Sequence, residues 1–478
     1  MFKQYSVILA LTATNGLLQM GHGALSALMI QQGGRLEFSE TALGLLISAT
    51  YVGFLASNAV LHRLLPRVSF IRTFAVCAAA ISSFALLMPI VPSEGMWTVL
   101  RVLYGAFFCA MVVICDAWLN NNATRENRGK LWGMFMTVNY LSFGAGQYIL
   151  IVGEKEAVHA FIVSAICLAV CLVPICLTRL PEPQPPARDA AAMRWRDAYA
   201  VAPVAFLGQF AFGVYTGATF LFISYVEGLG IAPERQATLA AMFFGFGFLM
   251  QIPIGWLADR VRDRRDVIIG VAAISGICAA VLGLGEILPY PVLALFIVLL
   301  GSVSCTLFSL NIAYGQDFVE REKSALYAGM LMRVYALGGL LGPPAAGFLM
   351  GAIAPGMLFW FCALVMGCAT LATATNRLMP RYRPAHTAQF RPASPLTATS
   401  VAEDLVYSET DIGPELPEEE PAPDAPPSDI GPELPEEETP PEFAPSDVGP
   451  EAPAAQSSDE GGGGGKISDS DNSETKAD

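Results

Sequence analysis

The chain has 478 residues and a formal net charge of −14, and 54% of its residues are hydrophobic while only 15% are charged. So apolar a composition is atypical of a soluble protein of this length and indicates a membrane protein. The negative charge is confined to one end: residues 400–478 hold 23 acidic and 2 basic residues, which leaves residues 1–399 with a net charge of +7.

The first 378 residues contain a series of long apolar runs. A helix needs about 20 mostly apolar residues to cross a bilayer, and twelve runs meet this length. The predicted spans are 6–30, 43–61, 70–91, 95–119, 129–153, 158–178, 199–225, 236–257, 266–287, 291–315, 325–350 and 355–376. The chain is therefore predicted to be an all-α membrane protein with twelve transmembrane helices.

The loops between these runs differ sharply in basic residues. Alternate loops and the flanks on the same side hold 20 Lys and Arg, whereas the opposite side holds only Arg35, Lys155 and Arg235. Because basic loops stay in the cytoplasm, both termini are predicted to be cytoplasmic.

The two halves of the chain repeat each other at an offset near 197 residues. The end of the second run and the loop after it match the end of the eighth run and the loop after it. Asn58, His62, Arg63 and Arg67 correspond to Gly255, Asp259, Arg260 and Arg264. A second pair, residues 133–138 and 329–334, opens the fifth and eleventh runs. Matched positions in both halves predict two pseudo-symmetric six-helix bundles, as in transporters.

This repeat divides the chain into four predicted regions. They are an N-terminal bundle, a cytoplasmic central loop, a C-terminal bundle and a disordered Pro/Glu-rich cytoplasmic tail: residues 1–178, 179–198, 199–378 and 379–478. The tail repeats Asp-Ile-Gly-Pro-Glu-Leu-Pro-Glu-Glu-Glu with a period of 18 residues, and its proline and charge content opposes a packed core. It is interpreted either as an acidic spacer or as a docking strip for a cytoplasmic protein.

The segment from Gly255 to Arg265 resembles the loop motif G-x-x-x-D-R-x-G-R-R of the major facilitator superfamily. The segments Asp116 to Asn120, Arg128 to Lys130 and Gly338 to Pro343 look most like the YcaD-like bacterial permeases. The resemblance implies a transporter that works by alternating access. It does not specify a substrate.

The loop motif supplies the predicted gating residues. Asp259 can cap a helix or pair with a loop arginine and so clamp the bundles together, with Gly255, Arg260, Arg264 and the first-half Arg63 in the same motif. The alternative is that these arginines only set topology and face anionic lipid.

Polar residues form a stripe on the first span and a matching stripe on the seventh. The predicted cavity residues are Asn15, Gln19 and His22 on one, and Gln209, Thr216 and Thr219 on the other. Polar atoms facing lipid would have no partners, so both stripes are expected to face an interior passage. Hydrogen bonding between helices without a ligand is the alternative.

Two arginines lie well inside predicted spans. Exposing the guanidinium of Arg101 or Arg333 to lipid would cost free energy. A guanidinium also presents paired N–H donors that fit a carboxylate or phosphate, so at least one of the two is predicted to contact an anionic group of the substrate. Alternatively, Arg333 bridges to Asp116 as a gate and Arg101 braces its helix. His22 or Asp116 would carry a coupled proton. Coupling to another counter-ion remains open.

Neither a nucleotide-binding loop nor a metal-ligand or catalytic constellation is found, so the chain is not expected to be an enzyme, to hold a cofactor or to bind nucleic acid. The prediction is a secondary transporter that moves a small polar or anionic solute. The rival interpretation is a non-transporting membrane receptor that signals through its tail.

Overall fold

The computed structural model describes residues 2–122, 128–178, 193–320 and 323–378, with no side-chain description for residues 2–6, 58, 62, 66, 128–130 and 325. These residues all belong to one contact unit, Met1–Pro414. The described residues form helices and no strand, which confirms the all-α prediction. The predicted tail, 379–478, and most of the predicted central loop lie outside the described residues.

The helices follow one another with short connections. The first eight are α1 (Phe2–Arg35), α2 (Glu40–Val68), α3 (Phe70–Leu87), α4 (Glu94–Asn122), α5 (Arg128–Gly146), α6 (Ile149–Lys155), α7 (Ala157–Val170) and α8 (Leu172–Leu177). The others are α9 (Trp195–Val201), α10 (Pro203–Thr219), α11 (Phe222–Gly228), α12 (Pro233–Gly245), α13 (Gln251–Arg260), α14 (Arg264–Leu282), the 3-10 turn η1 (Gly285–Ile287), α15 (Tyr290–Ser304), α16 (Thr306–Gln316), α17 (Ser324–Ala352) and α18 (Met357–Arg377).

Nine helical segments in the described ranges are long and apolar enough to cross a membrane, or ten if α9 and α10, bent by 114°, form one span. These nine segments correspond to the second to sixth and the ninth to twelfth predicted spans. The remaining three predicted spans coincide with α1, with α9 to α11, and with α12 and α13, whose polar residues and interruptions lower their continuous hydropathy. The total of twelve crossings stays a prediction.

Several predicted spans are interrupted rather than continuous. The fifth is divided into α5 and α6 after Gly146, and the eighth into α12 and α13 after Gly245. Glycine weakens a helix because it loses the most backbone freedom on folding. Glycine also allows the helices to pack closely here, because a Cβ at Gly144 of α5 would lie only 2.7 Å from the Cα of Gly245 of α12. The interruptions therefore accompany a close approach of α5 to α12.

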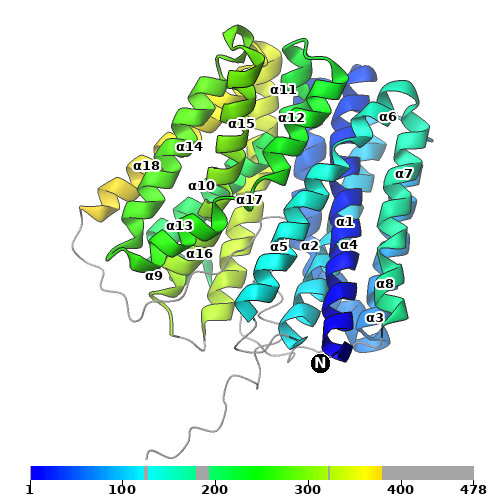
Figure 1. The fold of residues 1–478 in the computed structure, drawn as a ribbon, viewed down its shortest axis with the longest axis horizontal. Coiled ribbons are helices and arrows are strands. Elements are labelled where there is room, and N and C mark those ends of the chain that lie inside the picture. Colours follow the sequence, from blue (N-terminus) through cyan, green and yellow to red (C-terminus); the bar gives the residue numbers. More distant parts are fainter. Residues whose placement is uncertain (1, 123–127, 179–192, 321–322, 379–478) are drawn as a thin grey trace, which may run out of the picture. The chain divides into compact units, whose positions relative to one another are not determined.

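The helices form two groups, which we call the first half (α1 to α8) and the second half (α9 to α18). Figure 1 shows the two groups beside each other. Within the first half α1 packs against α5 and α7, and α2 against α4; within the second, α10 packs against α17 and α14 against α18. Helices α2 and α17, and α5 and α12, pack across the seam between the halves.

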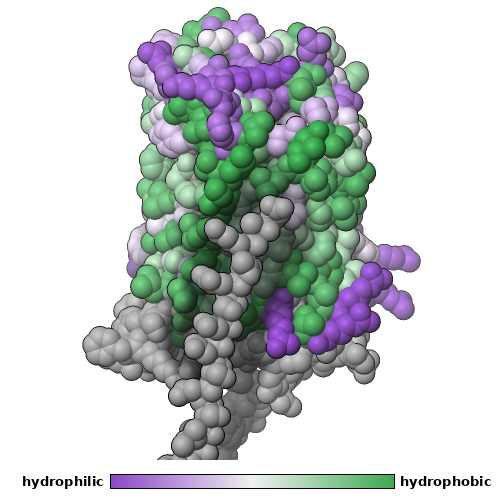
Figure 2. Space-filling model, turned by 90° about the vertical axis from the view of Figure 1, so that its right-hand side faces the viewer, coloured by the Kyte–Doolittle hydropathy of each residue, from purple (hydrophilic) through white to green (hydrophobic). Residues whose placement is uncertain are grey.

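Large apolar side chains lie exposed along the sides of the helices, among them Leu9 (70% exposed), Ile252 (73%) and Leu371 (66%). Figure 2 shows hydrophobic residues covering the middle of one face and hydrophilic residues gathered towards its two ends. A surface of this kind is stable in lipid hydrocarbon and not in water. The polar candidates should therefore be sought among the buried residues.

Candidate functional site

The polar stripe of α1 faces the protein interior. Asn15 and Gln19 are fully buried and His22 is 3% exposed. Neither amide atom of Asn15 has a hydrogen-bond partner among the described residues. A buried amide without a partner costs free energy, so this position is suited to water or a polar ligand.

The matching stripe on α10 is also buried, but its members differ in their hydrogen bonding. The Thr219 hydroxyl donates to the backbone oxygen of Thr216 at 2.8 Å, which satisfies it within the helix. The hydroxyl of Thr216 and both amide atoms of Gln209 have no partner in the described part of the chain. Gln209 and Thr216 are therefore stronger candidates for a ligand contact than Thr219.

Arg101 is buried within α4, where only 2% of the residue is exposed. Its Nε and Nη1 atoms have no hydrogen-bond partner among the described residues. The guanidinium carbon lies 5.0 Å from the centre of the Tyr104 ring, one turn along the same helix, in a cation–π contact. This contact leaves the forked N–H donors of Arg101 available for an anion.

His22 joins α1 to α4 through Tyr104. Its Nδ1 atom lies 3.0 Å from the Tyr104 hydroxyl, and its ring stacks on Phe108 with a centroid distance of 4.0 Å. Tyr104 thus lies between the imidazole of His22 and the guanidinium of Arg101. Tyr104 was not identified from the sequence, although its spacing of three residues from Arg101 places both on one helix face.

A tyrosine pair connects this region to the second half. The hydroxyl of Tyr51 on α2, which lies within electrostatic reach of Arg101, is 3.3 Å from that of Tyr335 on α17. The Tyr335 ring in turn packs against Phe212 on α10 and Phe308 on α16. The tyrosine pair therefore connects α2, which packs against the helix of Arg101, to α10, α16 and α17 of the second half.

The other intramembrane arginine has a different environment. Arg333 on α17 is partly exposed and makes no hydrogen bond or ion pair with the residues described. Asp116 on α4 is fully buried, and no ion pair joins it to Arg333 in this conformation. The gate suggested between these two residues is therefore not formed here.

The predicted gating motif forms a buried ionic cluster at the junction of α13 and α14. Arg264, 4% exposed, donates from Nη2 to Asp259 Oδ1 at 2.8 Å and from Nη1 to Asp317 Oδ1 at 3.2 Å. Asp317, which follows α16, was not predicted. These two bonds lie within the second half, so they brace the junction of α13 and α14 against the end of α16.

The remaining motif residues take simpler positions. Gly255 is buried in α13. Arg260 is exposed and places its guanidinium carbon 3.7 Å from the centre of the Trp256 ring. In the first half, Arg63 is exposed and forms no ion pair with a described residue. Exposed arginines of this kind fit the lipid-facing alternative as well as the gating one.

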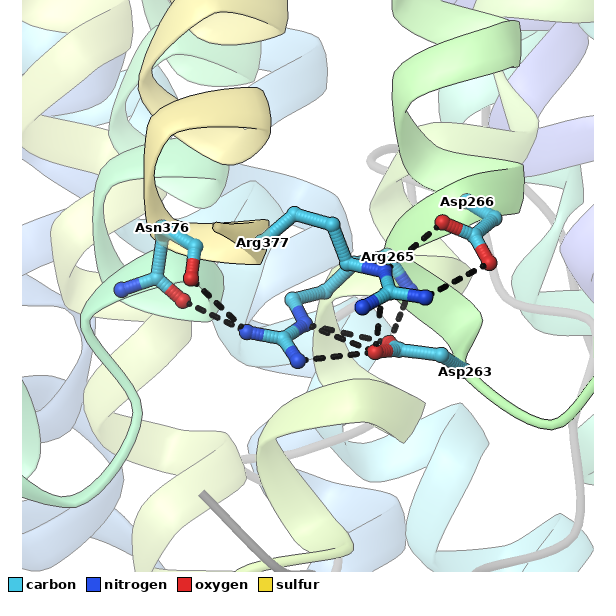
Figure 3. Close-up of polar contacts among 5 residues, drawn as sticks. All are labelled: Asp263, Arg265, Asp266, Asn376 and Arg377. Atoms are coloured by element: carbon cyan, nitrogen blue, oxygen red, sulfur yellow. Dashed lines mark hydrogen bonds and ion pairs between the residues drawn. The ribbon is translucent and has the colours of Figure 1, made fainter. Parts of the chain in front are cut away.

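A second ionic cluster, shown in Figure 3, joins the start of α14 to the end of α18. Arg265 donates from Nη2 to Asp263 at 2.7 Å and from Nη1 to the backbone oxygen of Asn376 at 3.0 Å, and Arg377 bonds Asp266 at 2.9 Å. Partial burial alone would raise the pKa of Asp263, but the hydrogen bonds from Arg265 and the charge of Arg377 lower it below its ordinary value.

Comparison with known proteins identifies the fold. The sequence profile described as Major Facilitator Superfamily matches residues 8–249 and 205–408. A relative in Salmonella newport (strain SL254), described as the uncharacterized MFS-type transporter YcaD, is 25% identical over 325 residues, which are 68% of this chain and 83% of the relative.

Two solved structures share the fold at low sequence identity. The nucleoside transporter NupG is 13% identical with a TM-score of 0.64, over 80% of this chain and 100% of that one. A D-xylose-proton symporter is 13% identical with a TM-score of 0.61, over 78% and 97% of the two chains. Together with the sequence profile, these matches confirm the resemblance noted in the sequence: the chain is a multi-pass membrane protein that belongs to the Major Facilitator Superfamily, among relatives named as YcaD-like transporters.

Proposed function

We propose that this protein is a secondary transporter that moves a small anionic solute across a bacterial inner membrane by alternating access. It would cross the membrane twelve times and keep both termini in the cytoplasm. The observation that carries the proposal is Arg101, a buried guanidinium whose Nε and Nη1 atoms have no partner among the described residues. Such a charge is retained at a high desolvation cost, which an anionic solute offsets when it binds.

The seam between α2 and α17 supports a rocking motion. A Cβ at Gly44 would lie 2.4 Å from the backbone oxygen of Pro343, and the Ser48 hydroxyl donates to the backbone oxygen of Leu340 at 2.6 Å. That oxygen is free to accept because Pro344, four residues later, has no N–H. Farther along the seam, Ser224 on α11 donates to the Glu40 carboxylate.

The contacts across this seam are concentrated on one side of the tyrosine pair. Beyond Tyr51, towards the junction of α2 with α3, residues such as Leu55 and Arg63 are exposed. No described residue of α2 beyond Tyr51 forms a hydrogen bond to the second half. With the arginine-rich junctions placed in the cytoplasm, this arrangement corresponds to a conformation closed on the outside and open to the inside.

Transport by the full-length protein in proteoliposomes tests the proposal directly. We expect uptake of at least one member of a panel of labelled small organic anions, including acetate, hexanoate, succinate and D-gluconate, above the level of empty liposomes. Arg101→Gln should abolish that uptake, whereas Arg72→Gln, at an exposed arginine of the same half on α3, should change it less than twofold. Absence of uptake for the whole panel would favour the receptor alternative.

A matched pair of glycine variants tests alternating access. Gly44→Ala places a methyl group against the backbone of α17, so the outer closure should fail and uptake should fall at least tenfold. Gly367→Ala is the control, because a Cβ there meets nothing within 4 Å. Equal uptake by the two variants would contradict a closing seam at α2 and α17.

A further inference from the structure

The second half contains two buried amide side chains with unused hydrogen-bonding atoms. Gln209 on α10 is fully buried and Asn311 on α16 is 1% exposed. Both amide atoms of Gln209 and the Oδ1 atom of Asn311 have no partner in the described part of the chain. The Asn311 side chain lies directly against α10, since a Cβ at Gly208 would be 2.7 Å from its Oδ1 atom.

These amides lie near the tyrosine pair that joins the second half to α2, the helix packed against the one that carries Arg101. Phe212 and Phe308, whose rings pack against Tyr335, are each three residues from one of the amides. Residues three apart share a helix face, so Gln209 lies one turn before Phe212 on α10 and Asn311 lies one turn after Phe308 on α16. Tyr335 meets Tyr51, and Tyr51 lies on α2, which packs against the helix that carries Arg101. The charged group, Arg101, belongs to the first half, whereas the neutral hydrogen-bonding groups, Gln209 and Asn311, belong to the second half.

The chemistry of the two sides differs in a way that constrains the solute. The paired N–H donors of an arginine guanidinium prefer a carboxylate or another planar anion. An amide presents two donors and an acceptor but no charge, and a hydroxyl group, which both donates and accepts, can satisfy either end. Leaving the amides without partners beside an apolar ligand would cost free energy, so a purely aliphatic anion is disfavoured.

We propose that the solute is a small hydroxylated organic acid, bound through its acidic group by Arg101 and through its hydroxyl groups by Gln209 and Asn311. This inference rests on the proposed transport function and narrows it to one class of substrate. Gln209 was identified from the sequence only as a cavity residue, and Asn311 was not identified. Together they determine specificity, while Arg101 determines the requirement for charge.

Binding to purified full-length protein in detergent, measured by isothermal titration calorimetry, tests the class with three probes. D-gluconate carries both the acid and the hydroxyl groups, hexanoate carries only the acid, and sorbitol carries only the hydroxyl groups. We expect D-gluconate to bind at least tenfold more tightly than either of the others, which corresponds to one net hydrogen bond or ion contact. Equal affinity for hexanoate, equal affinity for sorbitol, or no binding of D-gluconate would overturn the assignment. Uptake of hexanoate by proteoliposomes would still uphold the transporter.

Variants assign each recognition element to its residue. Arg101→Gln should remove the preference for D-gluconate over sorbitol, and Gln209→Met should remove the preference over hexanoate, about tenfold in each case. Asn311→Ala provides a second test of the hydroxyl contact if Gln209→Met fails to fold. Gln236→Met is the matched control because the Gln236 amide already donates to the backbone oxygen of Ile231. An equal loss of selectivity in the control would refute the assigned role of Gln209.

Discussion

The junction of α13 with α14 and the junction of α2 with α3 carry matching arginines in different environments. At an offset of 197 residues Arg264 corresponds to Arg67, yet Arg264 is buried in ion pairs while Arg67 is exposed. The difference lies in the acids: the positions of Asp259 and Asp317 are occupied in the first half by His62 and Asn120.

The comparison teaches that the carboxylates, not the arginines, decide where the junction is rigid. At the second-half junction, Asp259 and Asp317 compensate the desolvation of the buried Arg264 guanidinium. In the first half Asn120 instead accepts a hydrogen bond from the indole of Trp132 at 3.2 Å. We therefore expect the second-half junction to be the rigid one and the first-half junction to be the one that moves between conformations.

The largest difference between the two junctions should come from removing the matched arginines. Arg264→Ala leaves two carboxylates without their ion pair, one of them buried, and should lower the free energy of unfolding by about 3 kcal/mol. Arg67→Ala should change it by less than about 0.5 kcal/mol. Thermal unfolding of both variants in detergent checks the prediction. Equal losses would show that the two junctions are equivalent.

Converting one acid to its first-half counterpart should have a smaller effect. Asp317→Asn removes the charge that Nη1 of Arg264 contacts but keeps Asp259, so we expect a loss of about 1.5 kcal/mol. Asp266→Asn, at an exposed position, is the control and should cost clearly less. The same unfolding experiment measures both, and a neutral Asp317→Asn would mean that the charge of Asp317 is not needed to hold Arg264.

The pH dependence of stability should also distinguish the junctions. Because the pKa of Asp263 is lowered in the folded protein, its ionised form stabilises the fold at pH values above its ordinary pKa of about 3.9. That contribution is lost as the pH falls through the lower folded value. The gap in melting temperature between wild type and Asp263→Asn should therefore be constant above about pH 5 and close on acidification. A gap that widens in acid would contradict the assignment.

The smallest effect is expected at the exposed edge of the cluster in Figure 3. The side chains of Arg377 and Asp266 are 43% and 55% exposed, so water and salt screen their ion pair. Arg377→Ala should lower the melting temperature less than Arg265→Ala, whose guanidinium also binds Asn376. The difference between wild type and Arg377→Ala should vanish at about 1 M salt, where the Debye length is about 3 Å.

Much of the architecture could be predicted because hydropathy and charge are local properties of the sequence. Every predicted span coincides with a described helix or run of helices, and the positions of His22 and Arg101 inside the protein follow from the cost of exposing them to lipid. The interruptions at Gly146 and Gly245 were missed because they lie where α5 approaches α1 and α12 closely, which no single helix reveals.

The partners of the predicted residues were harder to foresee. Tyr104 and Tyr335 are unremarkable members of apolar runs until the neighbouring helices are in place. Asp317 lies 53 residues from Arg264, and nothing local connects them. The repeat did contain a signal, since the 197-residue offset pairs Asp317 with Asn120 and so marks a position where the halves differ in charge.

The backbone oxygen of Leu340 has a consequence for how this protein can vary. It accepts a hydrogen bond from Ser48, and Pro344, which has no N–H, cannot supply the hydrogen bond that the helix would normally provide. If Pro344 became alanine, the helix would recover its own bond and the hydroxyl of Ser48 would no longer be needed to satisfy that oxygen. Among natural variants, these two positions should change together, although they are almost 300 positions apart in the chain.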